Sequence, residues 1–275
     1  MHLRNKTVLI PGASRPVGRA IARRFGKEGA FLILPCYDWP EDTAEMKEEF
    51  QQAGFSFHTR TTDLRIDSEV QQLAEEIKKR TGHLDFLINN IERGGMPVVH
   101  GSYDLEHNKN QWNLEVETTL KAKWLLYHHC LPLMLHHPNG AVVNISSISA
   151  ITGRSGPAAQ LFSDGFSAAN RAVQSFTESW AREAAPDIRV NELMIGLIES
   201  RHGPGTRGWE ALTERETEAI LDHIPLKRIG HPDEIADAVF FLAVEARYMT
   251  GSTLRMDGGF ILGGEKFADM PPGLL

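Results

Sequence analysis

Short apolar runs alternate with longer amphipathic stretches along most of the chain. The apolar runs have the length of buried β-strands and fall at residues 7–10, 31–34, 56–59, 86–89, 141–145, 189–193 and 253–256. Apolar residues recur with helical spacing at residues 17–27, 43–53, 68–80, 111–135, 166–184 and 232–244. Strands that alternate with helices in this way are typical of a parallel sheet covered by helices. The pattern therefore predicts an α/β fold.

No internal repeat, low-complexity segment or linker divides the 275 residues. We therefore expect one domain over residues 1–275, a length that α/β folds use as a single unit. The stretch from Gly196 to Thr217 is irregular and includes Gly203, Pro204 and Gly205. Glycine and proline in such numbers indicate a loop, and a long loop beside a strand end often covers a ligand. Residues 196–217 are therefore predicted to form a substrate lid.

Composition and charge exclude several classes of protein. Hydrophobic residues make up 41% of the chain and charged residues 24%, as in an ordinary globular protein. The net charge of −7 argues against a nucleic-acid partner, which would require a basic surface. Cys36 and Cys130 are too few for a disulfide framework, and no apolar run has the length of a membrane span or the form of a signal peptide. We expect a cytoplasmic protein that binds neither nucleic acid nor membrane.

A glycine-rich turn follows the first predicted strand directly. Gly12, Ser14, Arg15 and Gly18 lie between that strand and the body of the first predicted helix. A nucleotide pyrophosphate binds at such a turn because the backbone approaches it closely and the helix N-terminus favours negative charge. The order of strand, turn and helix therefore predicts a dinucleotide site. The other expected partner is a small-molecule substrate or ligand of unknown identity.

Several further motifs accompany the glycine turn at 12–18. They are the pair Asp63-Leu64, the pair Asn89-Asn90, the strand end 144–147 with Ser147, and the segments 224–236 and 250–259. Together these motifs resemble the short-chain dehydrogenase/reductase family, and most of all its 3-oxoacyl-carrier-protein reductases, over residues 3–262. The resemblance implies a single Rossmann-type, doubly wound parallel sheet in the strand order 3-2-1-4-5-6-7, and NAD(P)-linked oxidoreductase activity. It also implies an adenine contact at Asp63-Leu64 and the catalytic serine at Ser147.

The two residues that carry the family's proton chemistry are replaced. Relatives use a Tyr-x-x-x-Lys pair, in which the lysine lowers the tyrosine pKa and holds the nicotinamide ribose while the tyrosine exchanges a proton with the substrate. The resemblance puts Phe166 and Asn170 at these positions. Loss of a positioned general acid costs about 10²–10⁴ in rate, or roughly 3–5 kcal/mol. Ordinary carbonyl reduction is therefore expected to be severely impaired.

Other family positions also depart from the pattern. Thr119 stands where relatives keep an asparagine that organises a proton-relay water, so that Ser147 alone of the four catalytic positions is retained. Glu92 replaces a glycine near the cofactor ribose, and Pro16 replaces a glycine of the cofactor turn. Because proline fixes φ near −65° and lacks an N–H, Pro16 is expected to disturb any conformation there that only glycine adopts.

The residues leave open the choice between NAD and NADP. An acidic residue at the end of the second strand would bind the ribose of NAD, whereas arginine favours the 2′-phosphate of NADP. Asp38 lies about two positions too late for the first role, and Arg15 sits where NADP-using relatives often keep a basic residue. Arg15 shifts the prediction slightly towards NADP, although an exposed arginine is as often an ordinary surface charge. Gly196, preceded by Ile195 where relatives have proline, is also assigned to the cofactor site.

Three residues are candidate replacements for the missing proton donor, namely Asp164, Glu92 and Tyr103. Each would have to fold inward, and side chains of this type usually stay solvated. The histidine pairs at 128–129 and 136–137 show no zinc-ligand spacing and no converging cysteine or carboxylate pattern. We therefore expect no metal site.

Three functions remain open from the sequence. The first is a degenerate family member that binds a nucleotide as a regulatory or structural subunit. The second is an active NAD(P)H-dependent carbonyl or enoyl reductase with a relocated proton donor. The third is a non-redox reaction on a bound acyl substrate, such as dehydration or epimerisation, and no residue supports it specifically. The resemblance also implies a homodimer or homotetramer, and it does not identify the substrate.

Overall fold

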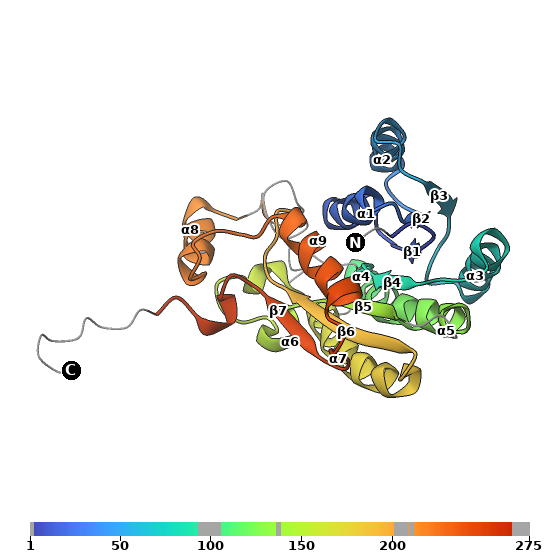
Figure 1. Ribbon diagram of the computed structural model, residues 1–275. Coiled ribbons are helices and arrows are strands. Elements are labelled where there is room, and N and C mark those ends of the chain that lie inside the picture. Colours follow the sequence, from blue (N-terminus) through green and yellow to red (C-terminus); the bar gives the residue numbers. More distant parts are fainter. Residues whose placement is uncertain (1–2, 93–105, 136–138, 201–208, 210–211, 266–275) are drawn as a thin grey trace, which may run out of the picture.

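Seven parallel strands form one sheet in the computed structural model, which describes residues 3–92, 106–135, 139–200, 209 and 212–265 (Figure 1). The strand order is β3-β2-β1-β4-β5-β6-β7, so that the predicted Rossmann-type fold is confirmed. The strands match the predicted apolar runs to within a few residues: β1 (Thr7–Leu9), β2 (Phe31–Cys36), β3 (Phe57–Thr61), β4 (Phe86–Asn89), β5 (Gly140–Ser147), β6 (Ile188–Ile195) and β7 (Thr253–Met256).

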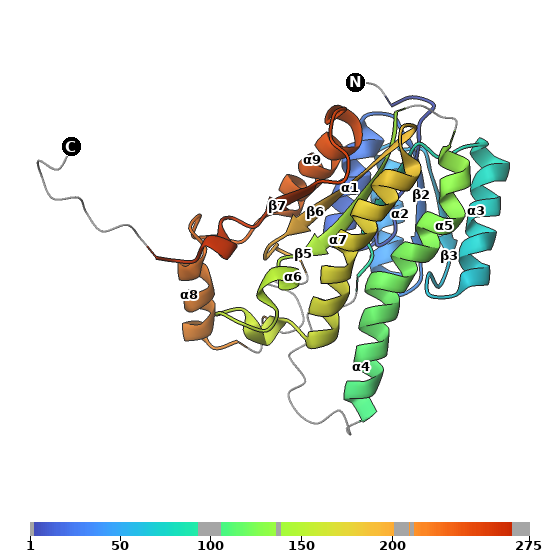
Figure 2. The same ribbon diagram turned by 90° about the horizontal axis from the view of Figure 1, so that it is seen from below.

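Helices cover both faces of the sheet (Figures 1 and 2). One face carries α1 (Pro16–Lys27), α2 (Pro40–Gln52) and α9 (Pro232–Phe240), and the other carries α3 (Asp67–Thr81), α5 (Ala122–Met134) and α7 (Asp164–Ala184). Alternate residues of β1 serve the two layers, since Val8 packs towards α1 and Leu9 towards α5. The remaining helices are α4 (Glu106–Val116), α6 (Ser149–Thr152) and α8 (Glu214–His223).

The predicted helix at 111–135 is interrupted. A π-helical turn, η1 (Glu117–Lys121), separates α4 from α5. Such a turn adds a residue to the helical repeat, and turns of this kind are frequent at functional sites. The helix predicted at 232–244 likewise ends in a π-helical turn, η3 (Phe241–Glu245).

Helix α8 begins inside the stretch predicted as a loop. Thr213 caps it, because its hydroxyl accepts from the N–H of Glu216 and the Glu216 carboxylate accepts from the N–H of Thr213. Thr-x-x-Glu before a helix is a capping box, and it is the signal in the sequence for this helix. Most of the predicted lid, at 201–208 and 210–211, lies outside the described residues.

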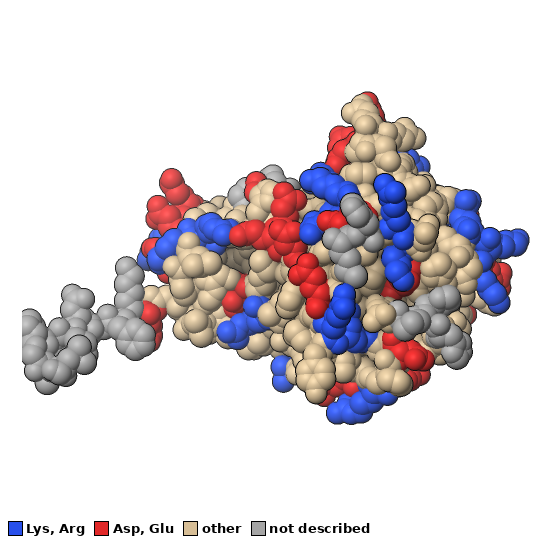
Figure 3. Space-filling model, in the orientation of Figure 1, with Lys and Arg blue, Asp and Glu red and all other residues tan. Residues whose placement is uncertain are grey.

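The described surface carries both signs of charge. Basic and acidic side chains lie interspersed on the face seen in Figure 3. Among the described helices, none combines the length and the apolar character that crossing a bilayer requires.

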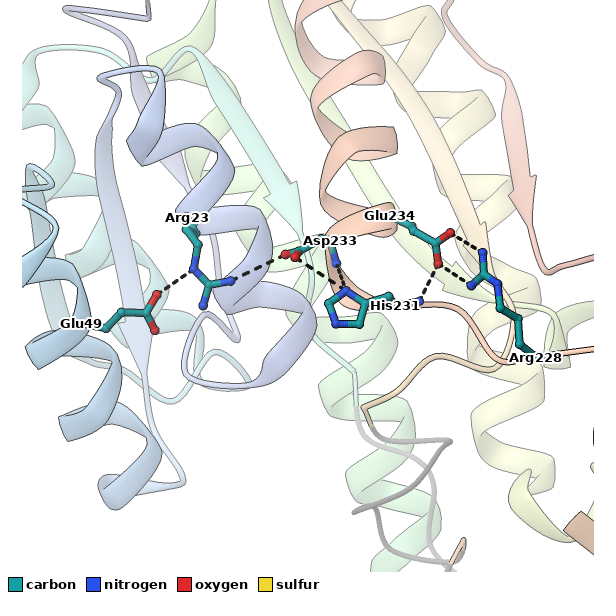
Figure 4. A network of polar contacts seen from close by, with 6 residues as sticks. All are labelled: Arg23, Glu49, Arg228, His231, Asp233 and Glu234. Carbon is teal, nitrogen blue, oxygen red and sulfur yellow. Dashed lines mark hydrogen bonds and ion pairs between the residues drawn. The ribbon is translucent and has the colours of Figure 1, made fainter.

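An ion-pair network joins α1, α2 and α9 (Figure 4). The guanidinium of Arg23 on α1 lies 2.7 Å from a carboxylate oxygen of Glu49 on α2 and 3.6 Å from one of Asp233 on α9. Partly exposed pairs of this kind contribute little singly, but a network orients the helices that it joins. The network therefore adds to the apolar packing of α9 on α1, the helix that follows the glycine turn.

Glu234 fixes the start of α9. Its carboxylate accepts from the N–H of His231 at 2.7 Å and from the two terminal nitrogens of Arg228 at 2.6 and 2.8 Å (Figure 4). These charged and backbone donors lower the pKa of Glu234 to about 2. The carboxylate is therefore ionised throughout the physiological range, and it holds the loop before α9 against the helix end.

Replacing Glu234 by glutamine should remove an acid-sensitive part of the stability. The pKa in the folded protein, about 2, lies below the usual 4.5, so the carboxylate stabilises the fold above pH 4.5 and this contribution is lost as the pH falls towards 2. In thermal melts, we expect Glu234→Gln to lie below the wild type near neutral pH and to approach it near about pH 3. Glu218→Gln, an exposed glutamate on α8, is the control. A deficit that is equally large at both pH values would contradict the assignment.

Candidate functional site

The predicted site residues gather at the carboxyl edge of the sheet. The strand order reverses between β1 and β4, and ligands of open α/β sheets bind in the crevice at such a point. Gly12 follows β1, Asn89 ends β4, Ser147 ends β5, and Gly196 follows β6 directly. The chain therefore brings these four predicted residues to one edge.

Gly12 and Gly18 lie where a side chain would overlap the backbone. Gly12 has a φ of +70°, and a Cβ added to it would lie 2.5 Å from the carbonyl oxygen of Asn90. A Cβ at Gly18 would lie 2.2 Å from the carbonyl oxygen of Gly12 and 2.6 Å from Asn90 Nδ2. That amide in turn donates to the carbonyl of Pro11 at 3.2 Å. The turn after β1 therefore packs directly on the residue that follows β4.

Pro16 begins α1. It occupies the first turn of the helix, after Arg15, whose extended backbone (φ −101°, ψ 157°) forms the cap. Proline is favoured there because its φ is already helical and its missing N–H has no helical partner to lose. The N–H groups of Val17 and Gly18 in the same first turn have no acceptor within the helix. Pro16 is thus compatible with an anion-binding helix start.

Arg15 and Ser14 lie on the side of the turn that faces α2. The Arg15 guanidinium is 4.4 Å from the ring centre of Trp39 and 3.0 Å from a carboxylate oxygen of Asp42. Ser14 is buried, and its carbonyl accepts from Arg19 at 3.0 Å. A 2′-phosphate at Arg15 would therefore compete with Asp42 for the guanidinium.

Asp63 follows β3 and is held by Arg65. Its two carboxylate oxygens accept from Arg65 Nε at 2.8 Å and Nη2 at 2.6 Å, and these bonds lower the pKa of Asp63. Leu64 packs into the apolar layer with α3 and α5. An adenine contact by Asp63 would share the carboxylate with Arg65.

A chain of buried amides runs beneath α7. Asn89 Nδ2 donates to Asn144 Oδ1 at 2.8 Å, and Asn144 Nδ2 donates to the hydroxyl of Thr177 on α7 at 2.9 Å. All three side chains are buried. Because buried polar groups are costly unless they are paired, this chain fixes the position of α7 over β4 and β5.

Phe166 and Asn170 lie on the face of α7 that carries Thr177, as their spacing requires. Phe166 is completely buried and packs on Phe162, with ring centres 6.2 Å apart, in an apolar cluster with residues of α8. Asn170 is completely buried, and its Nδ2 donates to the carbonyl of Phe166 at 3.0 Å. Its Oδ1 is buried and has no hydrogen-bond partner among the described residues. Position 166 is thus apolar and position 170 uncharged.

The helical and strand rises put Asn170 and Ser147 at the same level along the strand direction. The Asn144–Thr177 hydrogen bond sets the level of α7, which runs antiparallel to the strands. Seven helical residues from Thr177 back to Asn170 rise roughly 10 Å, and three strand residues from Asn144 to Ser147 rise roughly 10 Å in the same direction. Ser147 is buried, and its Oγ accepts from the N–H of Ser149 at 3.2 Å.

Thr119 is buried in the π-helical turn η1, and a lysine that sequence reasoning missed lies beside it. Lys123 Nζ donates to the carbonyl of Ile91 at 2.7 Å and to that of Thr119 at 3.1 Å. Ile91 follows the Asn89-Asn90 pair at the end of β4. The signal in the sequence is a lysine between the apolar residues Ala122 and Trp124, four positions after Thr119.

The candidate proton donors Asp164 and Glu92 differ in how far their side chains are exposed. Asp164 has a side chain that is 54% exposed and pairs with Arg154 at 3.2 Å. Glu92 is partly buried and follows Ile91 at the carboxyl end of β4. Tyr103 lies outside the described residues.

Gly196 lies where a side chain would overlap the residue that follows β7. A Cβ there would lie 2.7 Å from the Cα of Asp257, which follows β7. Its N–H donates to the carbonyl of Met256 at 2.9 Å. Gly196 thus lets the ends of β6 and β7 approach each other, whatever it contributes to a cofactor.

No cluster of three potential metal-binding side chains occurs within the described part of the chain. His128 stacks on Trp124 with ring centres 5.4 Å apart, and His129 pairs with Asp67 at 2.9 Å. The second histidine pair, at 136–137, lies outside the described residues. The first pair is therefore engaged in surface packing.

A family model described as enoyl-(acyl carrier protein) reductase matches residues 12–261, which is most of the chain. The chain belongs to the short-chain dehydrogenase/reductase family. It is 30% identical to nodulation protein G of Azospirillum brasilense, over 92% of this chain and 97% of that protein. It is also 30% identical to the 3-oxoacyl-[acyl-carrier-protein] reductase of Staphylococcus epidermidis, over 94% of this chain and 100% of that one.

A solved structure supports the same family. The short-chain dehydrogenase/reductase (glucose/ribitol dehydrogenase) of Brucella melitensis superposes with a TM-score of 0.76 at 26% identity, covering 94% of this chain and 97% of that one. The resemblance to this family and its 3-oxoacyl reductases, expected from the motifs, is confirmed. The chain is accordingly a homologue of NAD(P)-dependent oxidoreductases.

Membership of the short-chain dehydrogenase/reductases implies NAD(P) as cofactor, and the described residues fit it. The Gly12–Gly18 turn provides a close backbone approach beside the N-terminus of α1. Asn170 Oδ1 and Ser149 Oγ are buried polar atoms with no hydrogen-bond partner among the described residues. A polar ligand at this edge would supply partners that such atoms require.

Gly18→Ala tests the packing of the turn. The added Cβ would overlap the Gly12 carbonyl oxygen, and relief requires a backbone shift, because neither group is the end of a flexible side chain. We expect a loss of about 1–3 kcal/mol in the free energy of unfolding, measured by denaturant titration. Lys27→Ala, at an exposed position near the end of the same helix, should change stability by less than about 0.5 kcal/mol. Equal stability of Gly18→Ala and wild type would contradict the observed packing.

Proposed function

We propose that this short-chain dehydrogenase/reductase binds an NAD(P) nucleotide, with some preference for NADP, and does not perform the tyrosine-dependent carbonyl reduction of its family. The observation that carries the proposal is the pair Phe166 and Asn170 on the sheet-facing side of α7, at the height of Ser147. The proposed nucleotide binding is supported by the Gly12–Gly18 turn. The proposed lack of carbonyl reduction is supported by the absence of an ionisable group on both side chains.

Phe166 and Asn170 cannot supply the family's proton transfer. A phenyl ring has no proton to exchange, and the ring is completely buried beside Phe162. Asn170 carries no charge, and its amide is bound to the carbonyl of Phe166. A retained Ser147 could still orient a substrate oxygen, but orientation without the acid leaves a deficit of about 10²–10⁴ in rate. The resulting protein is a nucleotide-binding subunit or an enzyme of non-standard turnover.

An active reductase with a relocated donor is the second candidate. Glu92 supports it, because this partly buried carboxyl group follows Ile91, whose carbonyl accepts from Lys123. Asp164 supports it less, since its carboxylate lies at the surface on Arg154. Of the two candidate donors, Glu92 is therefore the one to test.

Turnover separates the two candidates. With an acetoacetyl thioester and NADPH, we expect the wild type to oxidise NADPH about 10²–10⁴-fold more slowly than the Staphylococcus epidermidis reductase assayed alongside it. Any residual rate should survive Glu92→Gln. A tenfold drop in Glu92→Gln, with nucleotide affinity unchanged, would favour the second candidate. Turnover equal to that of the relative would overturn the main proposal.

Arg15→Ala tests the preference for NADP. The guanidinium lies on the side of the turn that faces α2, where a 2′-phosphate would receive a charged hydrogen bond. We expect affinity for NADPH to fall by about tenfold or more and affinity for NADH to stay within twofold, measured by calorimetry. Arg24→Ala, a similarly exposed arginine at the far end of α1, is the matched control. Equal losses for both nucleotides, or none for either, would remove Arg15 from the 2′-phosphate site.

A further inference from the structure

A third apolar cluster lies at the carboxyl ends of β5 and β6, apart from the two clusters that the sheet forms with its helices. Phe166 belongs to it, together with residues of the segment before α7, of helix α8 and of the turn η4 (Phe260–Leu262). Among its buried members are Leu161, Phe162, Ile220 and Ile224. Position 166 is thus part of an apolar core in this chain.

Helix α8 contributes one face to this cluster. Glu216, Ile220 and Ile224 are spaced by four residues, so they lie on the same side of the helix. Ile220 and Ile224 are buried, whereas Glu218 is exposed. Figure 2 shows α8 beyond the end of the sheet at which β5 passes into α6. The helix therefore lies at that end with its apolar face turned inward.

Phe166 lies beyond the end of β5, next to Ser147. Asn170 is at the level of Ser147, and Phe166 precedes it by about one turn of α7, which adds roughly 5–6 Å in the direction of β5. Ile148, which follows Ser147, belongs to the same apolar cluster as Phe166. Ser147 is only 2% exposed. The serine is therefore enclosed, with this cluster beyond it.

The two ends of α8 are held by different kinds of contact. At the C-terminal end the backbone packs closely, because a Cβ on Gly264 would lie 2.7 Å from the carbonyl oxygen of Asp222. At the N-terminal end, the exposed Gln160 donates from Nε2 to Oε1 of Glu216 at 2.7 Å. A single exposed hydrogen bond contributes little, since water competes for both partners. The N-terminal end is therefore the one that detaches more easily.

We propose that α8 closes the Ser147 end of the site by docking on the cluster around Phe166, and that a molecule reaches Ser147 only when α8 moves away about its C-terminal end. The phenyl group at position 166 holds this cover shut, and Gln160 fastens its moving end. Side chains of the chain itself fill the apolar space beside the serine in the closed form. The inference goes beyond the proposed function and does not depend on nucleotide binding.

A thiol in place of the serine reports whether this end is open. Ser147→Cys is treated with iodoacetamide in the absence of nucleotide, and mass spectrometry of the peptides gives the labelling rate of each thiol. Cys130, completely buried on α5 in a different cluster, is the internal reference for opening of the whole fold. Ile220→Ala weakens the docking and Gln160→Ala removes the exposed hydrogen bond, each combined with Ser147→Cys. Glu218→Gln, at an exposed position on α8, is the matched control.

We expect the Ser147→Cys thiol of the folded chain to be labelled about tenfold or more slowly than in denaturant, because α8 must open first. Ile220→Ala should raise its rate by about tenfold or more and Gln160→Ala by a fewfold, with Cys130 and the Glu218→Gln control unchanged. Labelling as fast as in denaturant would show an open end. No acceleration in either variant, or an equal acceleration at Cys130, would show that α8 is not the cover. Each of these outcomes overturns the inference.

Hydrogen exchange over residues 214–223 is the second measurement, and it needs no reporter thiol. Ile220→Ala and Gln160→Ala should speed exchange in α8 and leave residues 122–134 of α5 unchanged. Faster exchange in α8 without faster labelling at position 147 would show that the helix does not cover Ser147, which overturns the inference. If Ser147→Cys fails to fold in thermal melts, exchange decides, and an α8 that is unaffected by both variants overturns the inference. Nucleotide titration tests the proposed function separately.

Discussion

The buried hydrogen bonds from Asn89 to Asn144 and from Asn144 to Thr177 set the position of α7 along the strands. These bonds link three buried polar side chains on three elements, and a slide of α7 would leave Asn144 Nδ2 without its partner. Everything placed at the carboxyl edge by α7 depends on this constraint. It brings Phe166 and Asn170 to the end of β5 where Ser147 lies.

The backbone of this chain fits a dinucleotide site, whereas the side chains at the reacting position differ from those of the family. The glycine turn and the amide chain are built as a dinucleotide fold requires, down to the close approach of Gly18 and Asn90. At the reacting position, by contrast, α7 presents a packed aromatic ring and a neutral amide. A fold that hosts many activities permits such an exchange, because the backbone positions a site without dictating its side chains.

Much of this architecture could be predicted from the sequence. Apolar runs located the strands, and a glycine turn between strand and helix located the nucleotide end of the site, because both signals are local. The π-helical turn before α5 has no comparable signal, since the periodicity of 111–135 fits one continuous helix. A π-helical turn changes which of the following side chains face inward, so the pattern of 111–135 does not predict that Lys123 is buried. The exposure of Asp164, whose carboxylate pairs with Arg154, agrees with the expectation that such side chains stay solvated.

Equilibrium titration of the wild type with NADPH, followed by calorimetry, tests most directly whether a nucleotide site persists beneath the altered chemistry. The account predicts saturable one-to-one binding with micromolar affinity, because the turn, the helix start and the buried polar layer are all in place. The absence of binding at millimolar NADPH and NADH would contradict it, and would leave the Gly12–Gly18 turn as packing alone.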